Sequence, residues 1–203
     1  RYQPYPEYKD SGVEWIGEVP AHWELQPIKH LAEVNNSGGY GDEVGVSPID
    51  RPVATTAQIT PDGHFQVERM PIRSFNTSEL RKYECSPGDI LIVKSSGSSE
   101  NIISGKAGIV RNDTPNFVFS NFLMRLRPRP NACSSIFLYS FLVSRVTRER
   151  VKQMCSSTTY PNLQVPTYTA AHAPVPPYDE QRSLATFLDR ETTRLDTLIE
   201  KKE

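Results

Sequence analysis

Short apolar runs in the middle of the chain have the spacing of β-strands. The unbroken run at residues 90–93 follows a Pro-Gly-Asp turn and predicts a buried strand, and residues 106–111 predict its hairpin partner. Apolar and polar residues then alternate over residues 117–127, which predicts a further strand with two different faces. We expect one face to carry Phe122, Met124 and Leu126 and the other to carry Arg125 and Arg127.

Helical spacing replaces this pattern after residue 133. Ser134 or Ser135 can cap a helix that we expect to end near Met154. Spacings of three and four place three basic side chains on one face of this helix. The apolar side is expected to hold Phe137, Leu138, Phe141, Leu142 and Val146, and the basic face Arg145, Arg148 and Lys152.

The N-terminal part is rich in turn-forming and aromatic residues. Residues 1–20 predict an extended arm with turns. Trp15 and Trp23 would hold this arm against the body, because each indole has a large apolar area that needs cover. Residues 23–34 predict a strand leading into a short turn, and the run of Asn, Ser and Gly at residues 35–41 predicts a flexible loop.

The last 28 residues predict a long helix. Two prolines precede it, Asp179 and Glu180 place negative charge in its first turn, and no later Gly or Pro interrupts it. Its apolar stripe consists of Leu184, Leu188, Leu195 and Ile199, widened by Phe187 and Leu198. Such a stripe needs a cover, which is either a partner helix or the body of the chain itself, and the spacing alone leaves both open.

Together these elements predict an α+β fold. We expect residues 1–175 to form a mixed domain, in which helices accompany a twisted, partly barrel-like sheet, and residues 176–203 to project as the start of a coiled-coil helix. The 203 residues suffice for a sizeable core, and 37% hydrophobic residues with 17 prolines favour a loop-rich mixed fold over a helical bundle.

Charge is unevenly distributed along the chain, although the net charge is only −1. Residues 69–152 hold 14 Lys and Arg against 6 Asp and Glu, a local balance of +8, which leaves −9 for the flanks. This segregation indicates a basic surface formed by the middle of the chain, unless the fold brings the opposite charges together again.

Patterns for catalysis are weak. Residues 175–178 (Val-Pro-Pro-Tyr) are similar to a motif of adenine methyltransferases, but Val175 stands where that motif needs a polar side chain, and no glycine-rich cofactor loop accompanies it. The four histidines are scattered without the spacing of metal ligands or a nucleophile partner: His22, His30, His64 and His172. We therefore expect no catalytic residue, no metal and no cofactor, and interpret the prolines as a rigid lead into the final helix.

The cysteines and the absence of long apolar runs indicate a cytoplasmic location. Cys85, Cys133 and Cys155 form neither a disulfide framework nor a metal-ligand pattern, as expected in a reducing compartment. Nothing resembles a signal peptide, and no apolar run reaches the roughly 20 residues that span a bilayer. Because the chain begins with Arg1, we expect its start to be trimmed.

Two loops have chemistry suited to nucleic acid. Hydroxyls, amides, ammonium groups and flexible backbone can approach phosphates and bond to base edges. In the loop at residues 94–106 the candidates are Lys94, Ser95, Ser96, Gly97, Ser98, Ser99, Asn101 and Lys106. In the loop at residues 156–164 they are Thr158, Thr159, Tyr160 and Asn162. The alternative is a plain hairpin connection for the first loop and an ordered turn with satisfied local backbone for the second.

Basic side chains outside these loops would add the salt-dependent, sequence-independent part of binding to DNA. The set consists of Arg73, Arg81, Lys82, Arg145, Arg148 and Lys152. Each is individually as well explained as an ordinary solvated charge, and the spacing does not say which of them face a duplex.

Both ends of the chain resemble one known family. The segment PPYDEQRSLATFLDRETTRLDTLIEKKE at residues 176–203 is similar to the start of the conserved helical region in specificity subunits of type I restriction–modification systems. Residues 8–23 resemble the N-terminal signature of the same subunits. Residues 88–98 and 156–164 are similar to a strand-and-loop element and a Thr-rich loop of their target recognition domains, whose loops face DNA.

This resemblance implies a non-catalytic, sequence-specific subunit with one target recognition domain that reads half of a bipartite site. It implies double-stranded DNA, adenine methyltransferase (modification) subunits and a restriction subunit as partners, with self-association through the final helix as a further option. The chain departs from the family because a second recognition domain and most of the spacer are missing. Two alternatives stay open: the recognition portion of a fused restriction–methylation enzyme, and a helical adaptor that does not bind DNA.

Overall fold

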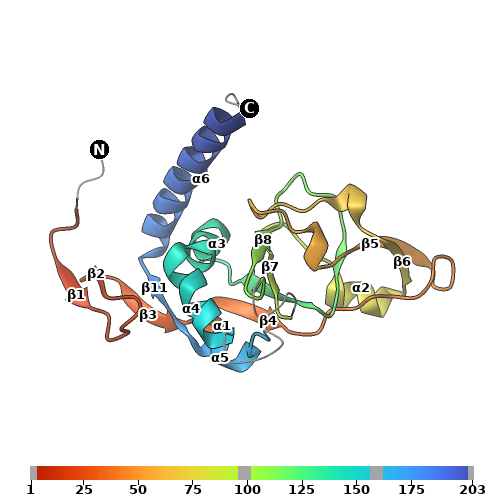
Figure 1. Cartoon of the computed structure of the whole chain (residues 1–203), viewed down its shortest axis with the longest axis horizontal. Coiled ribbons are helices and arrows are strands. Elements are labelled where there is room, and N and C mark those ends of the chain that lie inside the picture. The colour runs from red at the N-terminus through yellow and green to blue at the C-terminus, as the bar shows by residue number, and fades with distance from the viewer. Residues whose placement is uncertain (1–3, 96–101, 156–161, 201–203) are drawn as a thin grey trace.

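The computed structural model describes residues 4–95, 102–155 and 162–200, without the side chains of residues 196, 199 and 200. They form an elongated α+β body from which one long helix projects (Figure 1). The strands are β1 (Tyr8–Asp10), β2 (Glu18–Pro20), β3 (Glu24–Pro27), β4 (Ala32–Asn35), β5 (Ile49–Ala54), β6 (Ile72–Phe75), β7 (Ile90–Val93), β8 (Ala107–Ile109), β9 (Val118–Phe119), β10 (Leu123–Pro128) and β11 (His172–Val175). The α-helices are α1 (Ile28–Leu31), α2 (Thr77–Tyr83), α3 (Ser135–Val143), α4 (Arg145–Cys155), α5 (Val165–Ala170) and α6 (Tyr178–Glu200), with 3-10 turns at Thr56–Gln58 and Val67–Arg69.

The centre of the body is a four-stranded antiparallel sheet in the order β4-β10-β7-β8. Alternate residues of its strands enter two separate apolar cores. Ile90 and Ile92 pack with α3, α4 and α5 on one face, whereas Leu91 and Val93 pack with the phenyl rings of Phe117 and others on the opposite face. All four residues of β7 are fully buried, so the predicted strand at residues 90–93 and its hairpin partner β8 are confirmed.

A smaller sheet, β6-β5-β9, and helix α2 form the end of the body that is remote from α6 (Figure 1). The side chain of Asn76 accepts a hydrogen bond from the backbone of Glu79, and the Glu79 side chain accepts one in return from Asn76, so α2 begins with a complete capping box. The described strands form four small sheets and no closed barrel. The α+β class and the projecting helix are confirmed, and the partly barrel-like sheet is not.

The helix predicted from residue 134 to about 154 is two helices. Ser134 caps α3 as expected, since its hydroxyl accepts a hydrogen bond from the Phe137 amide. The chain then turns at Ser144, whose backbone is extended (φ −57°, ψ 150°), and the Ser144 hydroxyl accepts a bond from the Thr147 amide to start α4. The change of direction leaves Val146 51% exposed, so its expected place on the apolar side was wrong.

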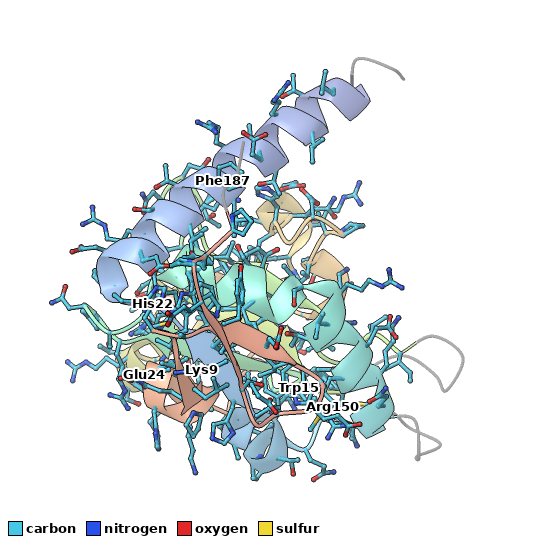
Figure 2. The ribbon with its side chains drawn as sticks, turned by 90° about the vertical axis from the view of Figure 1, so that its left-hand side faces the viewer. Lys9, Trp15, His22, Glu24, Arg150 and Phe187 are labelled. Carbon is cyan, nitrogen blue, oxygen red and sulfur yellow. The ribbon has the colours of Figure 1, made fainter. Side chains whose placement is uncertain are left out.

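The N-terminal residues form the β1–β2 hairpin, and two tryptophans attach this part of the chain to the body; Figure 2 labels the first of them, Trp15. The ring of Trp15 lies against Phe141 and that of Trp23 against Phe137, both on α3. The predicted anchoring role of the two indoles is confirmed, and residues 23–34 form β3, α1 and β4.

The three cysteines, Cys85, Cys133 and Cys155, are buried and free of disulfides. Burial raises the pKa of each thiol, to about 12 for Cys133, so they pack as apolar groups rather than as reactive thiolates. No helix in the described ranges is long and apolar enough to cross a membrane.

Glu180, in the first turn of α6, binds the N-terminal arm to the helix. Its carboxylate accepts hydrogen bonds from the Tyr5 hydroxyl and the Trp23 indole (3.0 Å), and His22 Nε2 lies 2.8 Å from its second oxygen. Burial alone would raise the pKa of Glu180, but the hydrogen bonds from these three side chains outweigh it and lower the pKa. The charged carboxylate therefore stabilises the folded state.

Replacing Glu180 by Gln is expected to lower the free energy of unfolding by about 1 kcal/mol at pH 7. Because the folded-state pKa is lowered, the contribution of the carboxylate is present above the ordinary value of 4.5 and is lost as the pH falls through the folded value. Urea unfolding from pH 7 to pH 3 should show that the free energies of unfolding of the parent and the Glu180→Gln variant become equal in acid. A difference that stayed constant over this range would contradict the role of the charge.

Candidate nucleic-acid interface

Three loops leave the same edge of the central sheet. At this edge β7 and β4 end and β8 and β10 begin. The antiparallel register shows this, since Val93 at the end of β7 pairs with Leu123 and Asn35 at the end of β4 pairs with Arg125. The candidate loop at residues 94–106 connects β7 to β8, the Asn/Ser/Gly-rich run follows β4, and the turn before β10 contains Phe122. We call this edge, with the described residues 36–40, 94–95, 121–122 and 162, the loop edge.

Lys94 joins the loops of the edge through its backbone. Its amide donates to the carbonyl of Phe122 (2.9 Å), and its own carbonyl accepts from the amide of Leu163 (2.7 Å). Ser95 and Asn162 form a β-bridge beside this pair of bonds. The fold thus brings together the bases of the two candidate loops, which lie more than 60 residues apart in sequence.

The two candidate lysines use their ammonium groups to attach other segments. Lys94 Nζ donates to the carbonyl of Asn36 (2.6 Å), whereas Lys106 Nζ donates to that of Ile59. Burial lowers the pKa of both lysines, and for Lys106 the nearby Arg148 lowers it further. Lys94 therefore fixes the loop after β4, and the structure does not bring the two ammonium groups to one place.

The remaining candidates divide into two groups. Ser95 is half-buried and Asn162 is exposed, so the Asn162 side chain is available to a partner at the loop edge. The others lie outside the described residues: Ser96, Gly97, Ser98, Ser99, Asn101, Thr158, Thr159 and Tyr160.

The loop at residues 36–40 packs closely on the turn before β10, which the sequence did not reveal. The Gly39 amide donates to the carbonyl of Phe119 (3.0 Å), and a Cβ added to Gly38 would lie 2.3 Å from the carbonyl oxygen of Ser120. The Gly-Gly pair that reads as a flexible loop is instead needed for close backbone approach. Two adjacent glycines in an otherwise polar run were the available signal.

Replacing Gly38 by Ala is expected to move residues 36–40 away from Ser120 and to destabilise the fold by about 1–3 kcal/mol. The backbone atoms that the new Cβ would meet cannot rotate aside, so the loop has to shift. Thermal unfolding measures the loss, and Ser37→Ala is the matched control because the Ser37 side chain is exposed. Equal melting temperatures for the two variants would contradict the close packing.

Cationic side chains flank the loop edge on the side of α2. The guanidinium of Arg73 lies 4.6 Å from the centre of the exposed Tyr40 ring, and the Asn35 side chain donates to the carbonyl of Lys82 (2.9 Å). Arg81 and Lys82 are exposed and form no ion pair within the described part of the chain. Exposed acids lie on the same segments, since Asp42 forms a β-bridge with Ser74 next to Arg73, so the border carries cations without being uniformly positive.

Some other basic residues of the middle segment are paired with acids, so the basic surface expected from the charge count is reduced. Arg127 binds the buried carboxylate of Asp89 through two bonds of 2.8 Å. Ion pairs also join Arg111 to Asp189 and Lys152 to Glu149. Arg148 donates to the carbonyl of Ser104, whereas Arg145 is exposed.

Phe122 does not join the core, contrary to the expected face shared with Met124 and Leu126. Those two side chains are fully buried, but β10 begins only at Leu123, and Phe122 lies in the turn beyond the sheet with 53% of its surface exposed. An exposed phenyl forgoes roughly 1–2 kcal/mol of burial. The alternation over residues 117–127 predicted one strand, whereas the structure divides this range into β9, a turn and β10, which belong to two different sheets. The two faces were predicted correctly only from Leu123 onward.

Helix α6 packs on α3 at its base and then extends beyond the body (Figure 2). Leu184 is half-buried, and exposure increases along the stripe, with 37% for Leu188 and 57% for Leu195. Phe187 (46%) and Leu198 (49%) are also exposed, and the side chain of Ile199 lies outside the description. The helix is thus not folded back over its whole length, and the outer apolar residues have no cover within the described chain.

Gln181 holds the base of α6 against the body. This side chain is 1% exposed, and its amide donates to the carbonyls of Ala132 (3.2 Å) and Pro176 (2.9 Å) while its oxygen accepts from the Ser134 amide (2.9 Å). The prolines 176 and 177 precede the helix directly, consistent with a rigid lead. The conspicuous Asp-Glu-Gln triplet therefore supplies two anchoring side chains, Glu180 and Gln181.

The chain thus combines an α+β body, a polar loop edge and a projecting amphipathic helix. The chain belongs to the family of type I restriction–modification DNA specificity domains, whose family model matches residues 22–203. The curated specificity subunit of the type I restriction enzyme MjaIX from Methanocaldococcus jannaschii is 26% identical to it over 206 residues, which cover 97% of this chain and 42% of that protein.

Solved structures agree with this family at the level of the fold. A chain from a study of complex assembly and conformational transition in a type I restriction–modification system matches 94% of this chain with a TM-score of 0.64 at 17% identity. The HsdS subunit from Thermoanaerobacter tengcongensis matches 97% with a TM-score of 0.60 at 16% identity. The chain spans about two fifths of the length of these proteins: 42% and 43% of the two solved chains.

Proposed function

We propose that this chain is a sequence-specific DNA-recognition module of a type I restriction–modification specificity subunit. The observation that carries the proposal is the loop edge, where two polar loops with nucleic-acid chemistry meet at Lys94 beside a border of exposed cations. Backbone bonds hold the bases of the loops, and amide and hydroxyl side chains are suited to base edges in the major groove. The function is to position the specificity subunit on DNA in the cytoplasm, and this chain itself catalyses no reaction.

Within this proposal the module reads one half of a bipartite target. The second half would be read by another recognition domain, and α6 would fix the distance and rotation between the two. Adenine methyltransferase subunits and a restriction subunit would bind the assembled specificity subunit.

DNA recognition is tested by selection from random duplexes. We expect the chain to enrich one short motif, and to bind it about 10³-fold more tightly than a scrambled duplex at fixed salt. Affinity for both duplexes should fall with rising salt, since Arg81, Lys82 and Arg73 contribute phosphate contacts. Failure to enrich any motif, with an intact fold, would exclude sequence-specific recognition.

Replacing Leu188 by Asp is expected to abolish association through α6 while leaving the body folded. This side chain is 37% exposed and borders the hollow between α6 and α3, so a carboxylate should cost the monomer about 1 kcal/mol and an apolar helix–helix contact much more. Co-purification with the modification subunit and light scattering measure association, and circular dichroism reports the fold. Thr186→Asp, at an exposed position of the same helix, is the control. Unchanged association of the Leu188→Asp variant would show that α6 does not bind a partner through its apolar stripe.

A further inference from the structure

We propose that Phe122 is a specificity-determining residue that contacts the methyl group of a thymine in the major groove. This inference deepens the proposed function and rests on it. Phe122 lies outside the two loops that the sequence singled out and was expected in the core, so neither the loop chemistry nor the strand pattern assigns it a role.

The position of Phe122 links it to both loops of the edge. Its carbonyl accepts the hydrogen bond from the Lys94 amide, and the Lys94 carbonyl accepts the bond from Leu163. The three residues thus belong to one row of backbone bonds at the end of β7. Any duplex that lay against the two candidate loops would also come close to the turn at residues 121–122.

The exposure of Phe122 is local and abrupt. Ser120 before the turn and Leu123 after it are fully buried, whereas Asn121 and Phe122 are both exposed, the latter by 53%. In the alternation of β10 the side chain is in phase with Met124, which is fully buried, so only the end of the sheet separates it from the core. The turn therefore presents one amide and one phenyl ring outward, at a place where the fold covers only part of the ring.

The chemistry of a phenyl ring limits what it can read. It has no hydrogen-bond donor or acceptor for base edges, so in the major groove it can distinguish bases through apolar contact with the thymine methyl group. The amides of Asn121 and Asn162, both exposed at the same edge, have the complementary ability to bond polar base edges. A methyl contact beside such amide contacts would let the edge read more than one base pair.

The border of the edge favours DNA over an apolar protein partner for this ring. Arg81 and Lys82 are exposed near the loop that Lys94 ties to the edge, through the bond between Asn35 and the Lys82 carbonyl. Exposed apolar residues of α6 have a different setting, since Leu188 and Leu195 continue one stripe along a helix. Phe122 is not part of such a stripe, and its described neighbours at the edge, Asn121 and Lys94, are polar, which suits a groove with phosphates on both sides.

The test uses the whole chain and the duplex that selection identifies. Phe122→Ala is compared with Tyr8→Ala, a matched control because the Tyr8 ring is 46% exposed but lies on β1, outside the central sheet. We expect Phe122→Ala to bind the selected duplex about 10-fold more weakly while its affinity for a scrambled duplex stays unchanged and circular dichroism shows an intact fold. Tyr8→Ala should bind both duplexes like the parent chain.

Replacing single thymines by deoxyuridine removes the methyl group alone. For the parent chain one such position should weaken binding by about 10-fold, and for Phe122→Ala the same position should cost nothing further, since the two changes remove one contact. If the parent binds selectively but Phe122→Ala binds equally well, or loses affinity for all duplexes alike, the inference is overturned and the proposed function stands. If the parent itself shows no selectivity, both fall.

Discussion

Replacing Asp89 by Asn is expected to lower the free energy of unfolding by about 3–5 kcal/mol. The Asp89 carboxylate is 1% exposed and receives two bonds from Arg127 and one from the Ser86 amide, each 2.8 Å long. Arg125, itself 3% exposed, has its Nε 3.9 Å from the same carboxylate. Loss of the negative charge would leave a buried guanidinium without a counter-charge, which is the costly case.

Urea unfolding measures this loss, and a second substitution tests its cause. Arg125→Met in the Asp89→Asn background removes the uncompensated charge and should recover part of the stability. Asp113→Asn is the control, because Asp113 is exposed, and should change stability by no more than about 0.5 kcal/mol. An Asp89→Asn protein as stable as this control would show that the buried ion cluster contributes little.

Replacing Gln181 by Leu is expected to cost about 3 kcal/mol and to loosen the attachment of α6. The substitution removes three hydrogen bonds, each worth about 1 kcal/mol net, and leaves the Ser134 amide and two carbonyls without their partner. Hydrogen exchange should show the first turns of α6 losing protection before the central sheet does. The effect on stability is read from the midpoint of urea unfolding.

Two further variants separate the hydrogen bonds from the shape of the side chain. Gln181→Glu keeps the size and the acceptor but replaces the amide donors by a buried carboxylate, so it should be at least as destabilising as Leu. Arg182→Ala changes the exposed neighbour and should have little effect. A stable, fully protected Gln181→Glu protein would mean that packing alone holds the helix.

The sequence predicted those elements whose signals are local. The apolar run of β7, the hairpin with β8 and the long helix α6 each depend on residues within a few positions of one another, and all three are confirmed. The two anchoring tryptophans were also foreseen, because a large indole needs cover wherever the chain goes. Residues at the tips of the candidate loops stay predictions.

Features that depend on distant pairings were missed or misread. Arg125 looked like one face of an ordinary strand, yet its partner Asp89 lies 36 positions away, and Arg111 finds Asp189 at a distance of 78 positions. The tight approach of Gly38 to Ser120 likewise joins segments that no local spacing connects. Ser144 ended a helix that contained neither Gly nor Pro at that point, because a serine can cap the next helix instead of continuing the first.

The loop edge is held together mainly by main-chain groups: the amide and carbonyl of Lys94, the amide of Gly39 and the bridge between Ser95 and Asn162. Main-chain bonds do not depend on which side chains the neighbouring residues carry. Mutations at outward-pointing positions could therefore accumulate with little loss of stability. New base-contacting side chains could arise in this way on an unchanged main-chain scaffold. Such a division would let one architecture diversify its targets while its apolar cores remain unaltered.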